Sequence, residues 1–78
     1  MSKKKDNLII KNRIKLARVE RNITQKELAE LVGVSRQTIV YIEQCKFYPS
    51  IKLSLLLGLA LDKKIEELFY FFYDEGDA

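Results

Sequence analysis

Five side chains between Arg36 and Tyr41 are of the types that can read the edges of DNA bases. An arginine can bond O6 and N7 of guanine, a glutamine can bond N6 and N7 of adenine, and a threonine or valine can meet the methyl group of thymine. This chemistry is hydrogen bonding and apolar contact, in which no covalent bond changes. The candidate base-reading residues are Arg36, Gln37, Thr38, Val40 and Tyr41.

Two short amphipathic segments joined by a turn would position these side chains. Thr24 can cap the first helix, and Glu27, three residues later, completes a capping box. Gly33 stands where that helix must end, because only glycine takes the left-handed conformation without steric cost. Ser35 can cap the second helix, which we expect over residues 36–44. The pattern predicts a helix-turn-helix, in which the first helix crosses the DNA backbone and the second enters the major groove.

The rest of the chain predicts a mainly α, compact five-helix domain, closed by a short two-stranded antiparallel sheet between its terminal segments. We expect one domain over residues 1–78, with a flexible basic arm at 1–6 and a dimerisation and tail segment at 66–78. The other expected elements are a strand at Leu8–Ile10, helices from Asn12 (as cap) to about Arg21, from Ile51 (capped by Ser50) to Leu61 and from Ile65 to about Tyr70, and a strand at Phe71–Tyr73. The side chains expected to point inward are Ile14, Ala17, Val19, Leu28, Ala29, Leu31, Val34, Ile39 and Ile42.

Residue types exclude several classes of function. The chain has one cysteine, Cys45, and no histidine, which argues against a disulfide framework, a zinc site and the usual acid-base or nucleophilic catalysis. We therefore expect no enzyme activity, no cofactor, no metal and no small-molecule ligand. The apolar run at residues 53–61 is too short to span a bilayer, and the first residues lack the apolar stretch of a signal peptide. We expect a cytoplasmic protein with no membrane partner.

The net charge of +3 is the sum of a basic first part of the chain and an acidic last part. Residues 1–48 carry eleven Lys/Arg against five Asp/Glu, a net charge of +6, and residues 49–78 have a net charge of −3. The basic part contains the helix-turn-helix candidate, where attraction to phosphates would be needed. Ordinary solvated surface charge is the alternative interpretation.

The chain resembles the Xre family, the Cro and lambda-repressor type of helix-turn-helix, over about residues 11–70. The matching residues are Arg18, the run TQKELAELVGVSRQTIVYIE from Thr24 to Glu43, Lys46, Pro49-Ser50 and Ile65–Phe69. Short proteins of this family are similar to stand-alone repressors that bind operators as dimers. The resemblance implies double-stranded DNA as partner, and a homodimer whose two recognition helices lie about 34 Å apart on a pseudo-palindrome.

The resemblance also implies roles for single residues. Gln25 falls where family members contact a phosphate, and we expect Thr24, Ser35 and Lys46 to bind phosphates as well. The residues that fall on the exposed face of the recognition helix are Arg36, Gln37, Thr38, Val40 and Tyr41. The alternative for Arg36 and Gln37 is that they are merely solvated polar residues at a helix start. Arg18 and Glu43 occupy paired positions and form an ion pair, either as a scaffold contact or to hold the reading face steady.

Two features depart from the family pattern. Cys45 stands where members usually have glycine, so it is either a redox-sensitive thiol near DNA or a tolerated substitution that costs about 1 kcal/mol in a left-handed conformation. The last third of the chain is richer in apolar residues than a small monomer needs, which indicates a homodimer interface. The alternative is that the aromatic side chains simply fill the core. The candidate interface residues are Leu56, Leu59, Leu68, Phe69, Phe71 and Phe72.

These observations favour a sequence-specific DNA-binding regulator, most simply a repressor. The alternative is an antitoxin, or another helix-turn-helix protein whose main role is to cover a partner. A tail that orders only on its partner would favour the alternative, and a tail locked into the fold would not.

Overall fold

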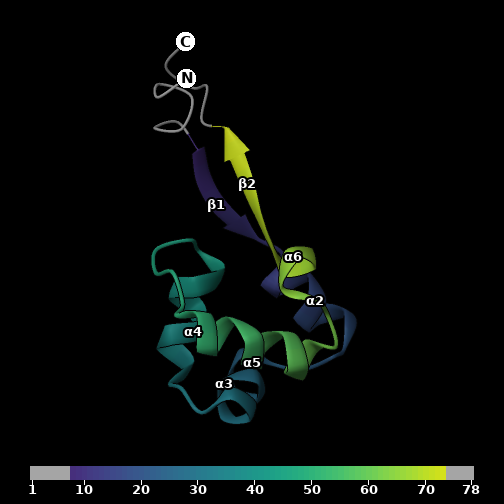
Figure 1. Cartoon of the computed structure of the whole chain (residues 1–78). Helices are drawn as coiled ribbons and strands as arrows, with labels where there is room; N and C mark the ends of the chain where they lie inside the picture. Colours follow the sequence, from purple (N-terminus) through teal and green to yellow (C-terminus); the bar gives the residue numbers. More distant parts are fainter. Residues whose placement is uncertain (1–7, 74–78) are drawn as a thin grey trace.

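Five helices form the body of the protein, and a two-stranded sheet projects from it (Figure 1). The computed structural model describes residues 8–73, so the predicted basic arm at residues 1–6 lies outside the described residues. The predicted fold class is confirmed. In chain order the elements are β1 (Leu8–Asn12), α2 (Ile14–Glu20), α3 (Gln25–Val32), α4 (Arg36–Glu43), α5 (Ile51–Leu61), α6 (Ile65–Leu68) and β2 (Phe69–Tyr73).

The sheet brings the two ends of the described chain together. Strands β1 and β2 pair antiparallel, with Leu8 opposite Tyr73 and Asn12 opposite Phe69, so the predicted pairing of the terminal apolar runs is confirmed. The fifth helix ends at Leu68 rather than near Tyr70. The physical reason is that Phe69 already has an extended backbone and enters the ladder, which a helical residue could not do.

The core lies between the helices and is built almost entirely from aliphatic side chains. Two residues predicted to point inward, Val19 and Leu31, are exposed instead. Val19 lies about 140° around α2 from buried Ile14, on the opposite side of the helix. On α3, Val32 takes the inward position on the side that packs against α4 and α5, and it shares this face with Leu28, four residues earlier. The buried apolar residues are Ile14, Ala17, Leu28, Ala29, Val32, Ile39, Ile42, Leu57, Leu61 and Leu68.

Asn12 joins the sheet, α2 and α4. The predicted cap is partly right: Arg13 holds the N-cap position of α2, but the Oδ1 atom of Asn12 accepts a hydrogen bond from the N–H of Ile14 at 3.1 Å. The Nδ2 atom of Asn12 donates to the main-chain carbonyl of Ile42 at 2.8 Å, near the C-terminus of α4. The helix itself ends at Glu20, one residue earlier than expected.

Helix α5 crosses the body and is its longest helix. Ser50 caps it, accepting a hydrogen bond from the N–H of Leu53 at 3.1 Å, as the sequence predicted. Among the described residues no helix is long and apolar enough to cross a membrane.

Candidate nucleic-acid interface

The turn between α3 and α4 has the geometry that the sequence predicted. Thr24 and Glu27 form a reciprocal capping box, with hydrogen bonds of 2.8 and 3.0 Å. Gly33 is left-handed at φ 78°, which ends α3 and turns the chain. Ser35 then accepts a hydrogen bond from the N–H of Thr38, so α4 starts at a fixed point and in a fixed direction. The two helices are therefore held in a defined relation before any ligand is bound.

The candidate base-reading residues lie on the outer side of α4, but their side chains differ in exposure to solvent. Arg36, Gln37 and Tyr41 are exposed, whereas Val40 is half-buried. Thr38 is also half-buried, and its hydroxyl lies 3.0 Å from the hydroxyl of Ser35. Because Thr38 is part of the cap, the exposed members of the set carry most of the surface that a base edge could meet.

A chain of hydrogen bonds runs from Arg36, one of the candidate base-reading residues, into the body of the protein. Arg36 donates from Nη2 to Oε1 of Gln25 at 3.2 Å, and Gln25 donates from Nε2 to Oε1 of Glu43 at 3.0 Å. Glu43 in turn accepts from Nε and Nη2 of Arg18 at 2.8 and 3.3 Å. This network connects the starts of α3 and α4 to α2.

Arg18 and Glu43 form the ion pair at the inner end of the network. Their side chains are only 11% and 5% exposed, and Arg18 also donates from Nη1 to the carbonyl of Ile23 at 3.0 Å. Glu43 belongs to the last turn of α4, so the contact holds the C-terminal end of this helix against α2. The pair has a structural role in the free protein, whatever it does when DNA is bound.

A polar hollow of about 430 Å³ lies beside the start of α3. The N–H groups of Gln25 and Lys26, in the first turn of α3, have no acceptor within their own helix, so the hollow combines cations with a helix N-terminus, as phosphate sites do. Thr24 and Gln25 are both part of it, and its three cations are Arg18, Lys26 and Arg36.

The segment after α4 contains Cys45 and Lys46. Cys45 is left-handed at φ 60°, the conformation in which glycine is usual. The N–H of Cys45 bonds the carbonyl of Ile42 at 2.9 Å, and the N–H of Lys46 bonds that of Tyr41 at 2.8 Å, which together form a Schellman motif. The motif leaves the side chain of Lys46 exposed, beyond the end of α4.

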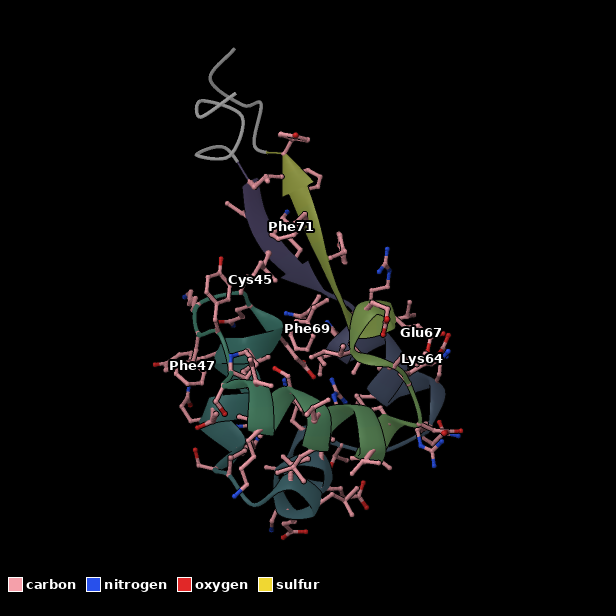
Figure 2. The ribbon with its side chains drawn as sticks, in the orientation of Figure 1. Cys45, Phe47, Lys64, Glu67, Phe69 and Phe71 are labelled. Atoms are coloured by element: carbon pink, nitrogen blue, oxygen red, sulfur yellow. The ribbon has the colours of Figure 1, made fainter. Side chains whose placement is uncertain are left out.

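The candidate dimer residues fall into two groups. Leu68 is buried in the core, and Leu56 and Phe69 are partly buried against it, so these three serve the monomer's own packing. Leu68 therefore lies away from the surface of the monomer, because α6 turns this side chain inward. Leu59, Phe71 and Phe72 are exposed. Figure 2 shows Phe71 on the projecting sheet and Phe69 at the base of the sheet, beside the helices.

Sequence reasoning missed the connections that converge on α4. The hydrogen bond from Asn12 to Ile42 joins residues 30 positions apart, and the one from Gln25 to Glu43 joins residues 18 positions apart. No local sequence pattern predicts either of them. Lys26 was also missed, although its place next to Gln25 at a helix start was a usable signal.

Comparison with known proteins places this geometry in a wider group. Residues 14–68 match the family described as Helix-turn-helix. The chain is similar to an uncharacterised HTH-type transcriptional regulator of Archaeoglobus fulgidus, with 44% identity over 85% of this chain and 93% of that one. A regulator of the same description from Methanocaldococcus jannaschii is also 44% identical, over 85% of this chain and 100% of that one.

The likeness extends to bacteria and to a solved structure. The regulator YgzD of Bacillus subtilis is 38% identical over 78% of this chain and 92% of its own length. A crystal structure of a candidate DNA-binding protein from Bacteroides fragilis superposes with a TM-score of 0.73 and 29% identity, and covers 80% of this chain and 100% of that one.

Proposed function

Because the chain belongs to the Xre family, the Cro and lambda-repressor type of helix-turn-helix DNA-binding transcriptional regulators, we propose that it is a cytoplasmic repressor that binds a pseudo-palindromic operator as a homodimer. The family acts by binding DNA and not by catalysis. In the proposed complex, α4 enters the major groove and the start of α3 lies against the phosphate backbone.

The exposure of Arg36, Gln37 and Tyr41 on one capped helix is the observation that carries the proposal. These residues read bases, and Thr38 and Val40 contribute at the edge of the contact. Gln25, Thr24 and Ser35 bind phosphates at the starts of the two helices, and Lys46 binds a phosphate beyond the end of α4. The polar hollow beside α3 supports the phosphate role, since it holds cations next to a helix N-terminus.

A homodimer fits the exposed apolar side chains of the last third of the chain, among them Leu59, Phe71 and Phe72. Two copies related by a two-fold axis would read two half-sites of inverted sequence, one helical turn or about 34 Å apart. A protein of this kind represses by occupying a site that the polymerase must reach.

The antitoxin or partner-covering alternative is less well supported. A tail that orders only on a partner would favour it, but residues 69–73 already form a strand paired with β1. No observation on the described residues specifically favours this alternative.

Selection of bound DNA from a random pool tests the proposal. We expect enrichment of an inverted repeat whose half-site centres lie about 10–10.5 base pairs apart. Enrichment of a single, unpaired half-site would contradict the dimeric operator, and binding without any sequence enrichment would contradict base reading by α4. A pool of double-stranded DNA at moderate salt keeps non-specific phosphate binding from masking the result.

A further inference from the structure

The turn that ends α4 contains a strained residue. Cys45 has φ 60°, a left-handed conformation that disfavours a residue with a side chain by a factor of about five or more. A residue in such a conformation persists only where its surroundings hold it in place. Lys46 comes next and is the proposed phosphate-binding residue beyond the end of α4, so this turn decides where its exposed side chain leaves the body.

Asn12, at the base of the sheet, contacts this turn from a distant part of the chain. Its Nδ2 atom donates a hydrogen bond to the carbonyl of Ile42 at 2.8 Å and lies 3.8 Å from Sγ of Cys45. The same carbonyl accepts a hydrogen bond from the N–H of Cys45 at 2.9 Å, and Figure 2 shows Cys45 close to the base of β1. A neutral hydrogen bond shifts an equilibrium by about fivefold, so the contact from Asn12 can offset the strain at Cys45.

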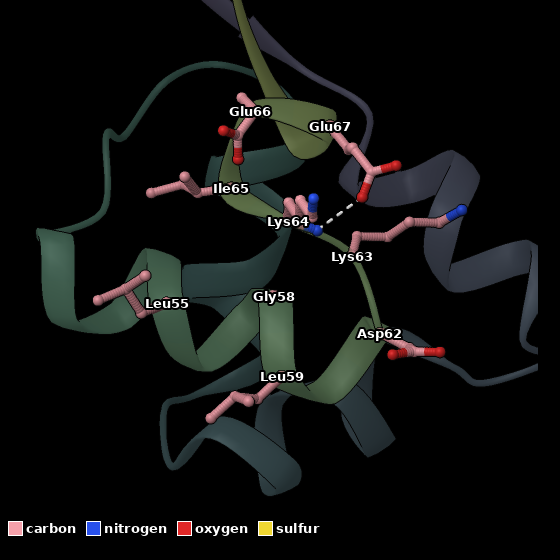
Figure 3. Close-up of a pocket in the computed structure, with 9 residues that line it drawn as sticks. All are labelled: Leu55, Gly58, Leu59, Asp62, Lys63, Lys64, Ile65, Glu66 and Glu67. Atoms are coloured by element: carbon pink, nitrogen blue, oxygen red, sulfur yellow. Dashed lines mark hydrogen bonds between the residues drawn. The ribbon is translucent and has the colours of Figure 1, made fainter.

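Asn12 is itself held in place, because the base of the sheet is joined to the core. It is the last residue of β1, and the N–H of Arg13, the next residue, donates to the carbonyl of Leu68 at 2.7 Å. The side chain of Leu68 is buried in the core. At the start of α6, the carboxylate of Glu67 accepts a hydrogen bond from the main-chain N–H of Lys64 at 2.7 Å (Figure 3). Strand β2 follows α6 directly, so both strands begin from fixed points at the helices.

We infer that Asn12 is a positioning residue for DNA binding, because it holds the left-handed turn at Cys45 and so places Lys46 against a phosphate. The inference deepens the proposed function and rests on it. Asn12 acts through the carbonyl of Ile42 and not by a contact of its own with DNA. The two-stranded sheet thereby gains a role, since it connects the core to the end of α4 that precedes the proposed phosphate contact.

The oxygen of the Asn12 side chain has a separate role, at the start of α2. Its Oδ1 atom accepts a hydrogen bond from the N–H of Ile14 at 3.1 Å. Serine keeps an oxygen that can accept such a bond, but it lacks the amide donor that reaches Ile42. Asn12→Ser therefore removes the contact with the turn, retains an acceptor for α2 and leaves the net charge of the protein unchanged.

Amide hydrogen exchange of the full chain without DNA, followed by NMR, tests the hold on the turn. Asn12→Ser should lower the protection of the N–H groups of Cys45 and Lys46 about fivefold, because one neutral hydrogen bond is lost. Asn22→Ser is the matched control, since Asn22 is exposed, is also left-handed at φ 58° and lies between α2 and α3. It should change the protection of these two groups less than about twofold. Cys45→Gly, added to Asn12→Ser, should restore the protection of Lys46 to within about twofold of the wild type, because glycine takes this conformation without strain.

A cycle of single and double variants measures whether Asn12 acts through Lys46. Each phosphate contact contributes about 0.9 to the slope of log affinity against log salt, which amounts to about eightfold in affinity at about 0.1 M salt. Lys46→Ala should show this loss on the selected operator and on random DNA. Asn12→Asp sets a carboxylate against the carbonyl of Ile42, at the helix end where negative charge is unfavourable. It should lose about three- to eightfold alone, and less than about twofold when Lys46→Ala is already present.

Four results would overturn the inference. They are unchanged protection in Asn12→Ser, a loss of protection that Cys45→Gly does not restore, wild-type affinity in Lys46→Ala, or losses that multiply in the double variant. Circular dichroism checks that each variant is folded, and Asn12→Ser replaces Asn12→Asp in the cycle if the charged variant does not fold. Failure of the wild type to bind the selected DNA would reject the proposed function. The exchange experiment needs no DNA, so it would still decide whether Asn12 holds the turn.

Discussion

Replacement of Glu43 by alanine should both destabilise the protein and weaken its binding to DNA. The carboxylate accepts three side-chain hydrogen bonds, two from Arg18 and one from Gln25. Its removal leaves a nearly buried guanidinium whose remaining side-chain bond is the one to the carbonyl of Ile23. It also frees Gln25, which accepts a hydrogen bond from Arg36, one of the proposed base-reading residues.

The structure sets the size of the effect. Breaking a buried ion pair from one side costs about 3–5 kcal/mol, because the other charge stays buried and unpaired. Arg18 retains 11% exposure and one carbonyl partner, so we expect the lower end, about 3 kcal/mol. For a chain of this size, 1 kcal/mol corresponds to about 4–8 °C in Tm, which predicts a loss of about 12–24 °C.

Thermal and urea unfolding followed by circular dichroism measure this loss, and operator titration measures the second effect. Glu30→Ala is the matched control, since Glu30 is an exposed glutamate on α3 and should change stability by at most about 0.5 kcal/mol. The double variant Arg18→Met/Glu43→Leu should recover most of the loss, because it removes both charges together. A Glu43→Ala protein with the Tm and the operator affinity of the wild type would refute the reasoning, as would a double variant less stable than the single one.

Three further predictions concern the proposed base-reading residues of α4 and the segment that follows this helix. Arg36→Ala or Gln37→Ala should weaken the selected operator by about 1–3 kcal/mol and random DNA far less, measured by fluorescence anisotropy; equal losses would contradict base reading. Lys46→Ala should weaken all sequences alike and lower the slope of log affinity against log salt by about one, and a sequence-dependent loss would count against a phosphate role. Cys45→Gly should raise the free energy of unfolding by about 1 kcal/mol, because glycine takes φ 60° without strain; an unchanged or lower value would show that the thiol's contacts outweigh the strain.

The helix caps and the turn could be predicted from the sequence, because each depends on residues close together in the chain. Thr24 with Glu27, Gly33, Ser35 and Ser50 each act on backbone groups within a few residues, so each cap or turn was predicted and is present. The inward face of α4 was also correct, since its two aliphatic residues stand three apart on one face.

The errors arose where packing between distant segments chose among equivalent residues. Leu31 and Val32 are both apolar and adjacent, and only the contact of α3 with α4 and α5 decides which of them turns inward. The end of α6 was misplaced for a similar reason. Phe69 could have continued the helix on local grounds, but its pairing with Asn12 requires an extended backbone.

The sequence by itself determined the motif, its caps and the residue types on the outer face of α4. These follow from hydrogen-bond geometry and hydrophobic periodicity over short ranges. Only the tertiary structure decided that Arg36, Gln25, Glu43 and Arg18 form one network, and that the exposed apolar side chains divide between the sheet and α5. Such contacts join segments far apart in the chain, so they exist only once the helices have packed.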